Sequence, residues 1–242
     1  MGKLEGRVAI VTGGSQGIGK AIARGLAIEG ARIVLAARSV DKLNHTAREL
    51  ASEGSTVAPI PTDVTDESQV SALFQRTQEL FDRLDILVNN AGAFDGGPLD
   101  EMSTESWDKV IATNLRGPFL CTRAAMRIMK AQRSGRILNI GSISAQRPRA
   151  NGAAYAASKF GLWGLTNATA LEGREFGIAV GCLHPGNVPF DNPSAPDPHA
   201  DEPMMAAKDL AEVAVLMLSQ PAHINMLEAI VLPVRQLYLG RG

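Results

Sequence analysis

Tyr155 and Lys159 stand four residues apart in an alanine- and glycine-rich run, residues 152–164, that contains no proline. Alanine favours a helix, and residues four apart on a helix lie on one face. The lysine cation would therefore lie beside the phenol and favour its ionised form, which lets a tyrosine give or take a proton near neutral pH. Reduction of a carbonyl, or oxidation of an alcohol, needs such a proton exchange. Because short motifs also match by chance, such a pair on its own more often lies on a solvated helix face.

A glycine-rich segment, residues 13–19, follows an apolar run at residues 7–12 and precedes a run with helical periodicity. A glycine loop between a strand and a helix can bind phosphate, because the backbone approaches closely and the helix N-terminus carries free N–H groups. The spacing from Gly14 to Lys20 matches a P-loop, but Ala21 stands where a P-loop needs Ser or Thr for magnesium. We therefore favour a dinucleotide over ATP, with a simple strand–helix turn as the remaining alternative.

The end of the next apolar run, residues 32–37, bears on the choice of cofactor. Dinucleotide sites often carry an acid about 20 residues past the glycines, where it bonds the ribose hydroxyl. No acid lies between Glu29 and Asp41, and the run is followed by Arg38 and Ser39. A guanidinium beside a hydroxyl suits a phosphate on the ribose 2′ position. We therefore predict NADP(H) rather than NAD(H), with an ordinary surface arginine as the alternative reading of Arg38.

Strand-like and helix-like segments alternate along the chain. Apolar runs predict strands over residues 7–12, 32–37, 56–61, 85–89, 136–140 and 178–183, and one more within 224–234; helical periodicity predicts helices over 18–30, 41–54, 66–81, 104–132 and 152–176. This alternation predicts an α/β Rossmann fold: a doubly wound parallel sheet of about seven strands with helices on both faces. We expect one domain over residues 1–242 and a substrate-binding loop at 186–207.

The composition excludes several classes of function. The chain has 242 residues, of which 45% are hydrophobic and 20% charged, and its net charge of −1 favours neither nucleic acid nor a membrane surface as a partner. No stretch is long and apolar enough to span a membrane, and residues 1–6 show no apolar signal region, so we expect a cytoplasmic location. Cys121 and Cys182 lie in apolar runs, which predicts buried free thiols rather than a disulfide or a metal site.

Several motifs occur in order over residues 5–188, and together they carry a resemblance. They are Thr12-Gly13-x-x-x-Gly17-Ile18-Gly19, Asn89-Asn90-Ala91-Gly92, Asn114, Ser142 thirteen residues before Tyr155, Lys159, and Pro185-Gly186. The chain thereby resembles the short-chain dehydrogenase/reductase family. The resemblance implies an NADP-dependent oxidoreductase that transfers a hydride between nicotinamide and a small-molecule carbonyl or secondary alcohol. A 3-oxoacyl-thioester reductase and a non-catalytic NADP-binding regulator are the alternatives.

The resemblance also implies roles for individual residues. Tyr155 would be the general acid in reduction and the general base in oxidation, while Lys159 would hold the nicotinamide ribose. Ser142 would bond the substrate oxygen, where negative charge develops, and Asn114 would support a water in a proton relay. The positions expected to contact the cofactor are Gly13, Ser15, Gln16, Gly17, Ile18, Gly19, Arg38, Ser39, Asp63, Val64, Asn90, Ala91, Gly92, Tyr155, Lys159, Pro185, Gly186 and Val188.

Two departures from the family pattern concern the substrate side of the site. Phe190 stands where many members have a threonine that bonds the nicotinamide amide, and residues 224–234 lack the Thr-Gly and Asp-Gly-Gly ending of many members. This ending favours a general carbonyl reductase or alcohol dehydrogenase over a 3-oxoacyl-thioester reductase. Arg147 and Arg149 could meet an anionic substrate, although solvated loop arginines are commoner.

The remaining expectations concern packing and assembly. His184 follows the predicted strand at 178–183, where we expect it to be packed and hydrogen-bonded. The expected pocket borders are Ala93, Phe94, residues 144–149, Phe190 and the loop up to Met205. Family members are usually dimers or tetramers, so the resemblance implies a homodimer or homotetramer built on the helices at 104–132 and 152–176.

Overall fold

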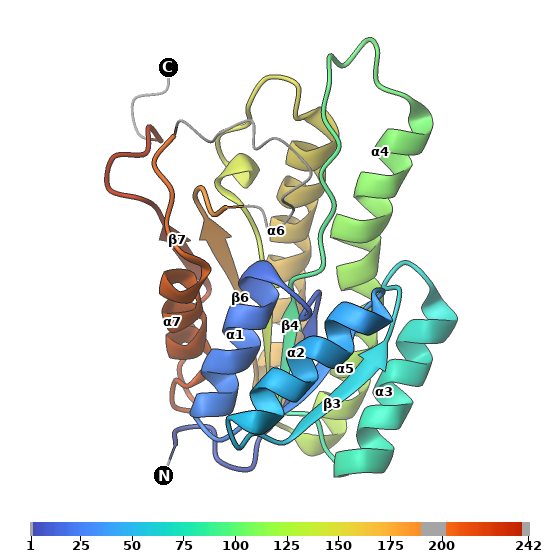
Figure 1. Ribbon diagram of the computed structural model, residues 1–242, viewed down its shortest axis with the longest axis vertical. Coiled ribbons are helices and arrows are strands. Elements are labelled where there is room, and N and C mark those ends of the chain that lie inside the picture. The colour runs from blue at the N-terminus through green and yellow to red at the C-terminus, as the bar shows by residue number, and fades with distance from the viewer. Residues whose placement is uncertain (1, 190–201, 239–242) are drawn as a thin grey trace.

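The computed structural model describes residues 2–189 and 202–238 (Figure 1). The strands are β1 (Val8–Thr12), β2 (Arg32–Ala37), β3 (Val57–Pro61), β4 (Ile86–Asn89), β5 (Gly135–Ile140), β6 (Ile178–Pro185) and β7 (Glu228–Val231). The α-helices are α1 (Gly17–Ile28), α2 (Val40–Ser52), α3 (Glu67–Phe81), α4 (Thr104–Ile111), α5 (Gly117–Gln132), α6 (Ala153–Gly173) and α7 (Ala207–Leu218). Short helical turns join some of them: the π-helical η1 (Ala112–Arg116) and the 3-10 turns η2 (Ile143–Ala145) and η3 (Arg174–Phe176).

Every strand pairing in the described residues is parallel, in the order β3-β2-β1-β4-β5-β6-β7. This confirms the predicted doubly wound sheet. The order reverses between β1 and β4, so the connections leave to opposite sides there and open a crevice at the carboxyl ends of the strands. The chain therefore places its ligand site at the ends of β1, β4, β5 and β6.

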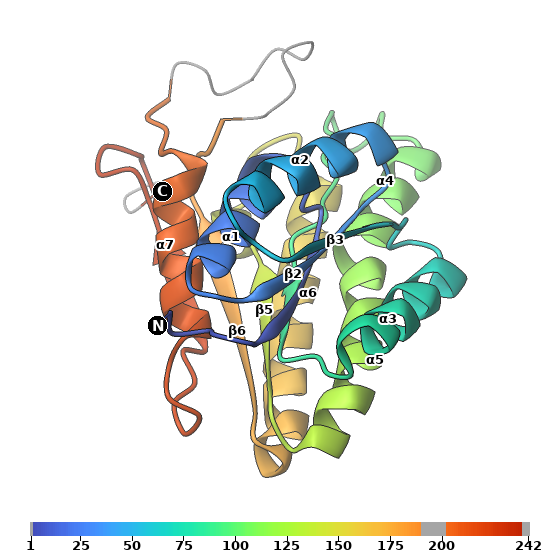
Figure 2. The same ribbon diagram turned by 60° about the horizontal axis from the view of Figure 1, so that its bottom comes forward.

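Helices cover both faces of the sheet (Figures 1 and 2). Helices α1, α2 and α7 pack on one face, and α3, α5 and α6 on the other. All five residues of β1 are fully or almost fully buried. Ala9 and Val11 pack in the core on one face of the sheet, and Val8 and Ile10 pack in the core on the other. A strand buried on both faces shows an unbroken apolar run rather than alternation, which explains the sequence pattern. None of the helices in the described residues is long and apolar enough to cross a membrane.

The structure refines the predicted helices. The expected helix over residues 104–132 is α4 and α5 joined by the π-helical turn η1, and the one over 152–176 is α6 followed by η3. The sequence analysis assigned no element to α7, although Leu210, Ala214 and Met217 repeat there at helical spacing and are buried. Phe190 and residues 190–201 of the expected substrate loop lie outside the described residues.

An almost completely buried carboxylate, that of Asp85, fixes the start of β4. It accepts hydrogen bonds from the backbone N–H of Val8 (2.9 Å), from Arg7 (2.7 Å) and twice from Arg83 (2.8 and 2.7 Å). Burial opposes ionisation, but the hydrogen bonds from Arg83, Val8 and Arg7 outweigh it and hold the pKa of Asp85 below its usual value. Asp85 thus ties the beginning of β4 to the beginning of β1.

Buried polar side chains also join the other ends of β4 and β5. Asn89 and Asn139 are paired in register, and Asn89 Nδ2 donates to Asn139 Oδ1 (2.8 Å) and to Thr122 Oγ1 of α5 (3.0 Å). Asn139 Nδ2 in turn donates to Thr166 Oγ1 of α6 (2.8 Å). This chain of hydrogen bonds, here called the asparagine ladder, lies directly beneath the expected site.

The two cysteines are buried free thiols, as predicted. Burial raises the pKa of both Cys121 and Cys182 to about 12. Neither thiol is therefore ionised to a significant extent near neutral pH.

Candidate active site

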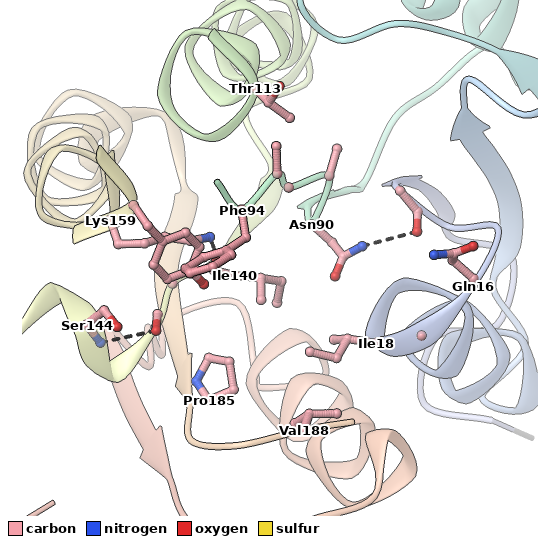
Figure 3. A pocket seen from close by; sticks show the side chains of 18 of the residues that line it. Gln16, Ile18, Asn90, Phe94, Thr113, Ile140, Ser144, Lys159, Pro185 and Val188 are labelled. Carbon is pink, nitrogen blue, oxygen red and sulfur yellow. Dashed lines mark hydrogen bonds between the residues drawn. The ribbon is translucent and has the colours of Figure 1, made fainter. Parts of the chain in front are cut away.

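One cleft with a volume of about 980 Å³ opens at the carboxyl ends of the strands (Figure 3). It brings together nearly all the residues that the sequence analysis singled out: Gly13, Ser15, Gln16, Gly17, Ile18, Arg38, Ser39, Asp63, Val64, Asn90, Ala91, Gly92, Ser142, Tyr155, Lys159, Pro185, Gly186 and Val188. Two residues of that set, Gly19 and Asn114, are not part of the cleft lining. Figure 3 shows Gln16 and Ile18 on one side of the cleft and Ser144 and Lys159 on the other.

The glycines let two loops of the cleft touch. Gly13 has a φ of +63°, and a Cβ there would lie 2.8 Å from Asn90 Nδ2 and 2.9 Å from Ala91 Cα. At Gly19, a Cβ would lie only 2.3 Å from the carbonyl oxygen of Gly13. Asn90 Nδ2 fills the space and donates to the carbonyls of Thr12 (3.0 Å) and Gly13 (3.2 Å). Gly19 therefore permits close packing of α1 beneath the loop. Its contact with a cofactor stays a prediction.

Two cations lie at the far end of this half of the cleft. Within the described residues, Arg38 makes no hydrogen bond or ion pair, and it borders the cleft together with Lys42. Lys42 Nζ donates to Gln16 Oε1 (2.8 Å), which ties the start of α2 to the start of α1. The sequence analysis missed Lys42. Its signal was its position one helical turn after Arg38, at the start of the helix predicted over residues 41–54.

The catalytic candidates occupy the other half of the cleft. Tyr155 lies in the first turn of α6 and Lys159 one turn later, so that Lys159 Nζ is 5.5 Å from the centre of the Tyr155 ring. The ammonium group is buried and donates to the carbonyl of Ile140 at the end of β5 (2.8 Å). In the part of the chain that the structure describes, the Tyr155 hydroxyl makes no hydrogen bond. It is therefore available to a ligand.

Ser142 is the second residue after β5 and is held from two sides. Its Oγ accepts from the backbone N–H of Ser144 (3.1 Å), and its carbonyl oxygen lies 2.9 Å from His184 Nδ1. Burial lowers the pKa of His184, which keeps the imidazole neutral at pH 7. Nδ1 also lies 3.3 Å from the backbone nitrogen of Ser142, so the tautomer decides whether Nδ1 donates to the carbonyl or accepts from the N–H. The ring also packs edge-on against Trp163, with 5.6 Å between ring centres. His184 is therefore packed and hydrogen-bonded, as predicted.

Asn114 lies in the π-helical turn η1 and is almost completely buried. Its Oδ1 accepts from the N–H of Ala93 (2.7 Å), and its Nδ2 donates to the carbonyl of Ala93 (2.8 Å) and to Ser158 Oγ (3.2 Å). These bonds hold the segment after β4, which lines the cleft, against α6. The side chain thus supports the wall of the cleft from behind.

The substrate side of the cleft also contains residues that the sequence analysis named as borders. The Phe94 ring contacts the Tyr155 ring edge-on, with 5.4 Å between ring centres, and 48% of Phe94 is exposed. Arg149 lines the cleft, whereas Arg147 is exposed and does not. Asn187, also in the lining, was missed because a single Asn after Pro-Gly carries no chemical signal of its own. Among the described residues, no three His, Cys, Asp or Glu side chains come together as a metal site.

Known proteins are similar to this chain over most of its length. Residues 7–195 match a family model described as short chain dehydrogenase. The chain belongs to this family. This short-chain dehydrogenase is 36% identical over 231 residues to an uncharacterized oxidoreductase of Staphylococcus aureus (strain N315). The matched region covers 96% of this chain and 99% of that protein.

Solved structures of similar proteins extend over almost the whole chain. A metagenomic short-chain oxidoreductase in complex with NADP has a TM-score of 0.85 and 38% identity, covering 96% of this chain and 98% of that one. An alcohol dehydrogenase from the archaeon Thermococcus sibiricus, complexed with 5-hydroxy-NADP, has a TM-score of 0.88 and 30% identity, covering 95% and 97%. This short-chain dehydrogenase is therefore an oxidoreductase with the predicted Rossmann-like α/β fold.

Proposed function

We propose that this protein is an NADP-dependent oxidoreductase acting on a carbonyl or secondary alcohol, with Tyr155 as the general acid/base. The observation that carries the proposal is one cleft that holds a glycine loop at one end and Ser142, Tyr155 and Lys159 at the other. A proton donor and an oxygen-binding hydroxyl are what hydride transfer to a carbonyl requires from a protein. The NADP complex of a similar oxidoreductase supports the proposal.

The cleft fits NADP(H). The glycine loop lines the cleft through Gly13, Ser15, Gln16 and Gly17, and the start of α1 lies beside it, as a phosphate site requires. Arg38 and Lys42 form a cationic end that suits a 2′-phosphate. The residues that would hold the cofactor are the cleft-lining members of the predicted set, joined by Lys42.

The protein's own residues would complete the reaction as follows. When bound, NADPH would be the source of the hydride that the carbonyl carbon accepts. Tyr155 gives its hydroxyl proton to the carbonyl oxygen as the C=O bond becomes a C–O–H group, and Ser142 Oγ donates a hydrogen bond to the same oxygen. Lys159 places its positive charge beside the phenol, which stabilises the tyrosinate left behind. Oxidation of the alcohol reverses these steps, with Tyr155 as the base.

Replacement of Tyr155 by Phe tests this function. Removal of the proton donor should lower kcat with NADPH and a ketone by roughly 10²- to 10⁴-fold, because that is the usual contribution of a general acid. NADPH binding, measured by nicotinamide fluorescence, should stay within about threefold, because the ring remains in place. Tyr238→Phe is the matched control, since Tyr238 donates to Gln146 outside the cleft lining.

The outcomes separate the competing functions. Parental turnover in Tyr155→Phe would refute the assigned mechanism. Tight NADPH binding without turnover of any ketone, aldehyde or alcohol would favour the non-catalytic NADP-binding regulator. Turnover of 3-oxoacyl thioesters alone would favour the thioester reductase. A homodimer or homotetramer and a cytoplasmic location stay predictions.

A further inference from the structure

Arg149 and Asn187, which line the substrate side of the cleft, belong to a cluster of hydrogen-bonded polar side chains. Arg149 precedes α6 and makes a two-pronged ion pair with Glu202, Nη1 to Oε1 at 3.1 Å and Nη2 to Oε2 at 2.8 Å. Asn187, which follows β6, accepts from Arg149 Nη2 (3.1 Å) and donates to Glu202 Oε2 (2.8 Å). Gln236 exchanges two hydrogen bonds of 2.9 Å with Asn187. We call Arg149, Asn187, Glu202 and Gln236 the arginine cluster.

Within the arginine cluster, Glu202 neutralises Arg149, the cation that a negatively charged substrate would meet. Arg38, Lys42 and Asp63 border the nucleotide end of the cleft, and Lys159 belongs to the catalytic pair. Among the described lining residues, this leaves Arg149 as the charged group of the substrate side. Its side chain is only 19% exposed, and its partner Glu202 is itself fixed by Asn187. A paired carboxylate and guanidinium together carry no net charge into the cleft.

A substrate carboxylate could not use Arg149 without displacing Glu202. The substrate carboxylate would replace the Glu202 carboxylate, which has the same chemistry and is already held in position beside Arg149. The exchange would therefore bring no net gain in interaction. Its own dehydration would then lack compensation, and Glu202 would be left in a partly buried place without its cation. The cluster therefore disfavours anionic substrates.

The rest of this wall suits an uncharged, apolar group. Phe94 is half exposed beside the ring of Tyr155, on the same side of the cleft as Lys159 and Ser144 (Figure 3). Ala93, Pro189 and Met204 also line the cleft. An aromatic or other flat apolar substituent on the carbonyl carbon would cover the exposed part of Phe94, and aromatic rings favour such contacts.

We propose that Glu202 is a specificity-determining residue: by pairing with Arg149 it restricts the enzyme to uncharged carbonyl compounds or alcohols with an apolar substituent and excludes their carboxylate analogues. This inference rests on the proposed function for its substrate chemistry. It assigns a separate task to the arginine cluster, because none of the four side chains takes part in the proton transfer.

Methyl benzoylformate and benzoylformate test the proposal, because they share the ketone and the ring and differ in charge. The parent should reduce the ester with a kcat/KM on the order of 100-fold above that for the acid. Glu202→Gln should raise the acid-to-ester ratio by roughly ten- to a hundredfold, the range of a hydrogen bond to a newly uncompensated charge. The double variant Arg149→Gln, Glu202→Gln should return the ratio to near its parental value. Glu212→Gln, on the exposed side of α7, is the charge-matched control and should leave the ratio unchanged.

Calorimetric titration of benzoylformate into the NADP⁺-loaded protein gives a readout that needs no turnover. Glu202→Gln should bind it at least about tenfold more tightly than the parent; if this variant does not fold, Glu202→Ala replaces it. Equal reduction of acid and ester by the parent, or unchanged benzoylformate affinity in both Glu202 variants, would overturn the inference. No reduction of the ester by the parent would count against the proposed function instead, and the calorimetric comparison would still decide the role of Glu202.

Discussion

Asn114 is the best place to separate structural support from chemistry. The family resemblance implies that this residue supports a water in a proton relay, whereas the structure shows three direct hydrogen bonds from its side chain. We predict that Asn114→Ala lowers both stability and activity, and that the two losses occur together. The reason is that the substitution releases Ala93 and its neighbour Phe94 from α6.

The magnitude follows from the bonds that are lost. Each of the three contributes on the order of 1 kcal/mol net, and the two backbone groups of Ala93 lose their partners in a partly buried place. The free energy of unfolding should therefore fall by about 2–4 kcal/mol, which for a chain of this size corresponds to a melting temperature lower by roughly 5–15 °C. KM for the ketone should rise, because the Phe94 ring no longer holds its place against Tyr155.

Urea unfolding and steady-state kinetics on the same preparations provide the test. Asn114→Asp is informative as a second variant, since its carboxylate can still accept from Ala93 N–H but cannot donate to the Ala93 carbonyl. Asn167→Ala is the control, since the Asn167 amide donates to the carbonyl of Trp163 in its own helix and is not part of the cleft lining. Parental unfolding free energy in Asn114→Ala together with lost turnover would show that the residue acts in the chemistry alone and would refute the reasoning from its contacts.

Three further predictions use other parts of the chain. Arg38→Asp should weaken NADPH binding by about 1.5–3 kcal/mol in a fluorescence titration and leave NADH binding nearly unchanged; equal NADPH affinity would remove Arg38 from the site. Asp85 has a folded-state pKa below its unfolded value, so its stabilisation is present above about pH 4 and is lost as pH falls through the folded value. Asp85→Asn should therefore lower stability by about 1–3 kcal/mol at pH 7 and flatten the acid side of the stability profile; a parental profile would contradict this. Cys121 and Cys182 should resist alkylation by iodoacetamide at pH 8 until the protein unfolds, since burial raises both pKa values to about 12; rapid labelling of the native protein would contradict this.

Local patterns in the sequence predicted the elements and their order well. Strand and helix periodicities are visible within a few residues of sequence. Features of this short range include the apolar run at β1, the glycines after it and the Tyr155–Lys159 spacing. The parallel sheet then brings the ends of distant strands to one edge, so the cleft could be expected before the fold was seen. Helix α7 had the same kind of signal and was overlooked beside the long Pro-rich loop.

Partner choice between distant segments could not be predicted in the same way. From the sequence, Arg149 could be expected either to contact an anionic substrate or to lie in solvent. The structure pairs it instead with Glu202, which lies 53 residues further along the chain. Gly19 allows α1 to approach the glycine loop, a packing role that the sequence analysis did not predict. In both cases the outcome depends on which backbone atoms the finished fold places within a few ångströms, and residue type alone does not encode that.

The asparagine ladder also bears on how the sheet avoids misassembly. The run Ile86-Leu87-Val88 is uniformly apolar. A shift in the register of β4 along β5 would therefore bury nearly the same apolar surface and lose little hydrophobic stabilisation. Asn89 and Asn139 make such a shift costly, because each amide would lose its hydrogen-bond partner and remain buried without water. The ladder therefore favours the native register of β4 against β5 during folding. This register brings Asn90, which follows Asn89, and Ser142, which lies three residues after Asn139, to the same cleft.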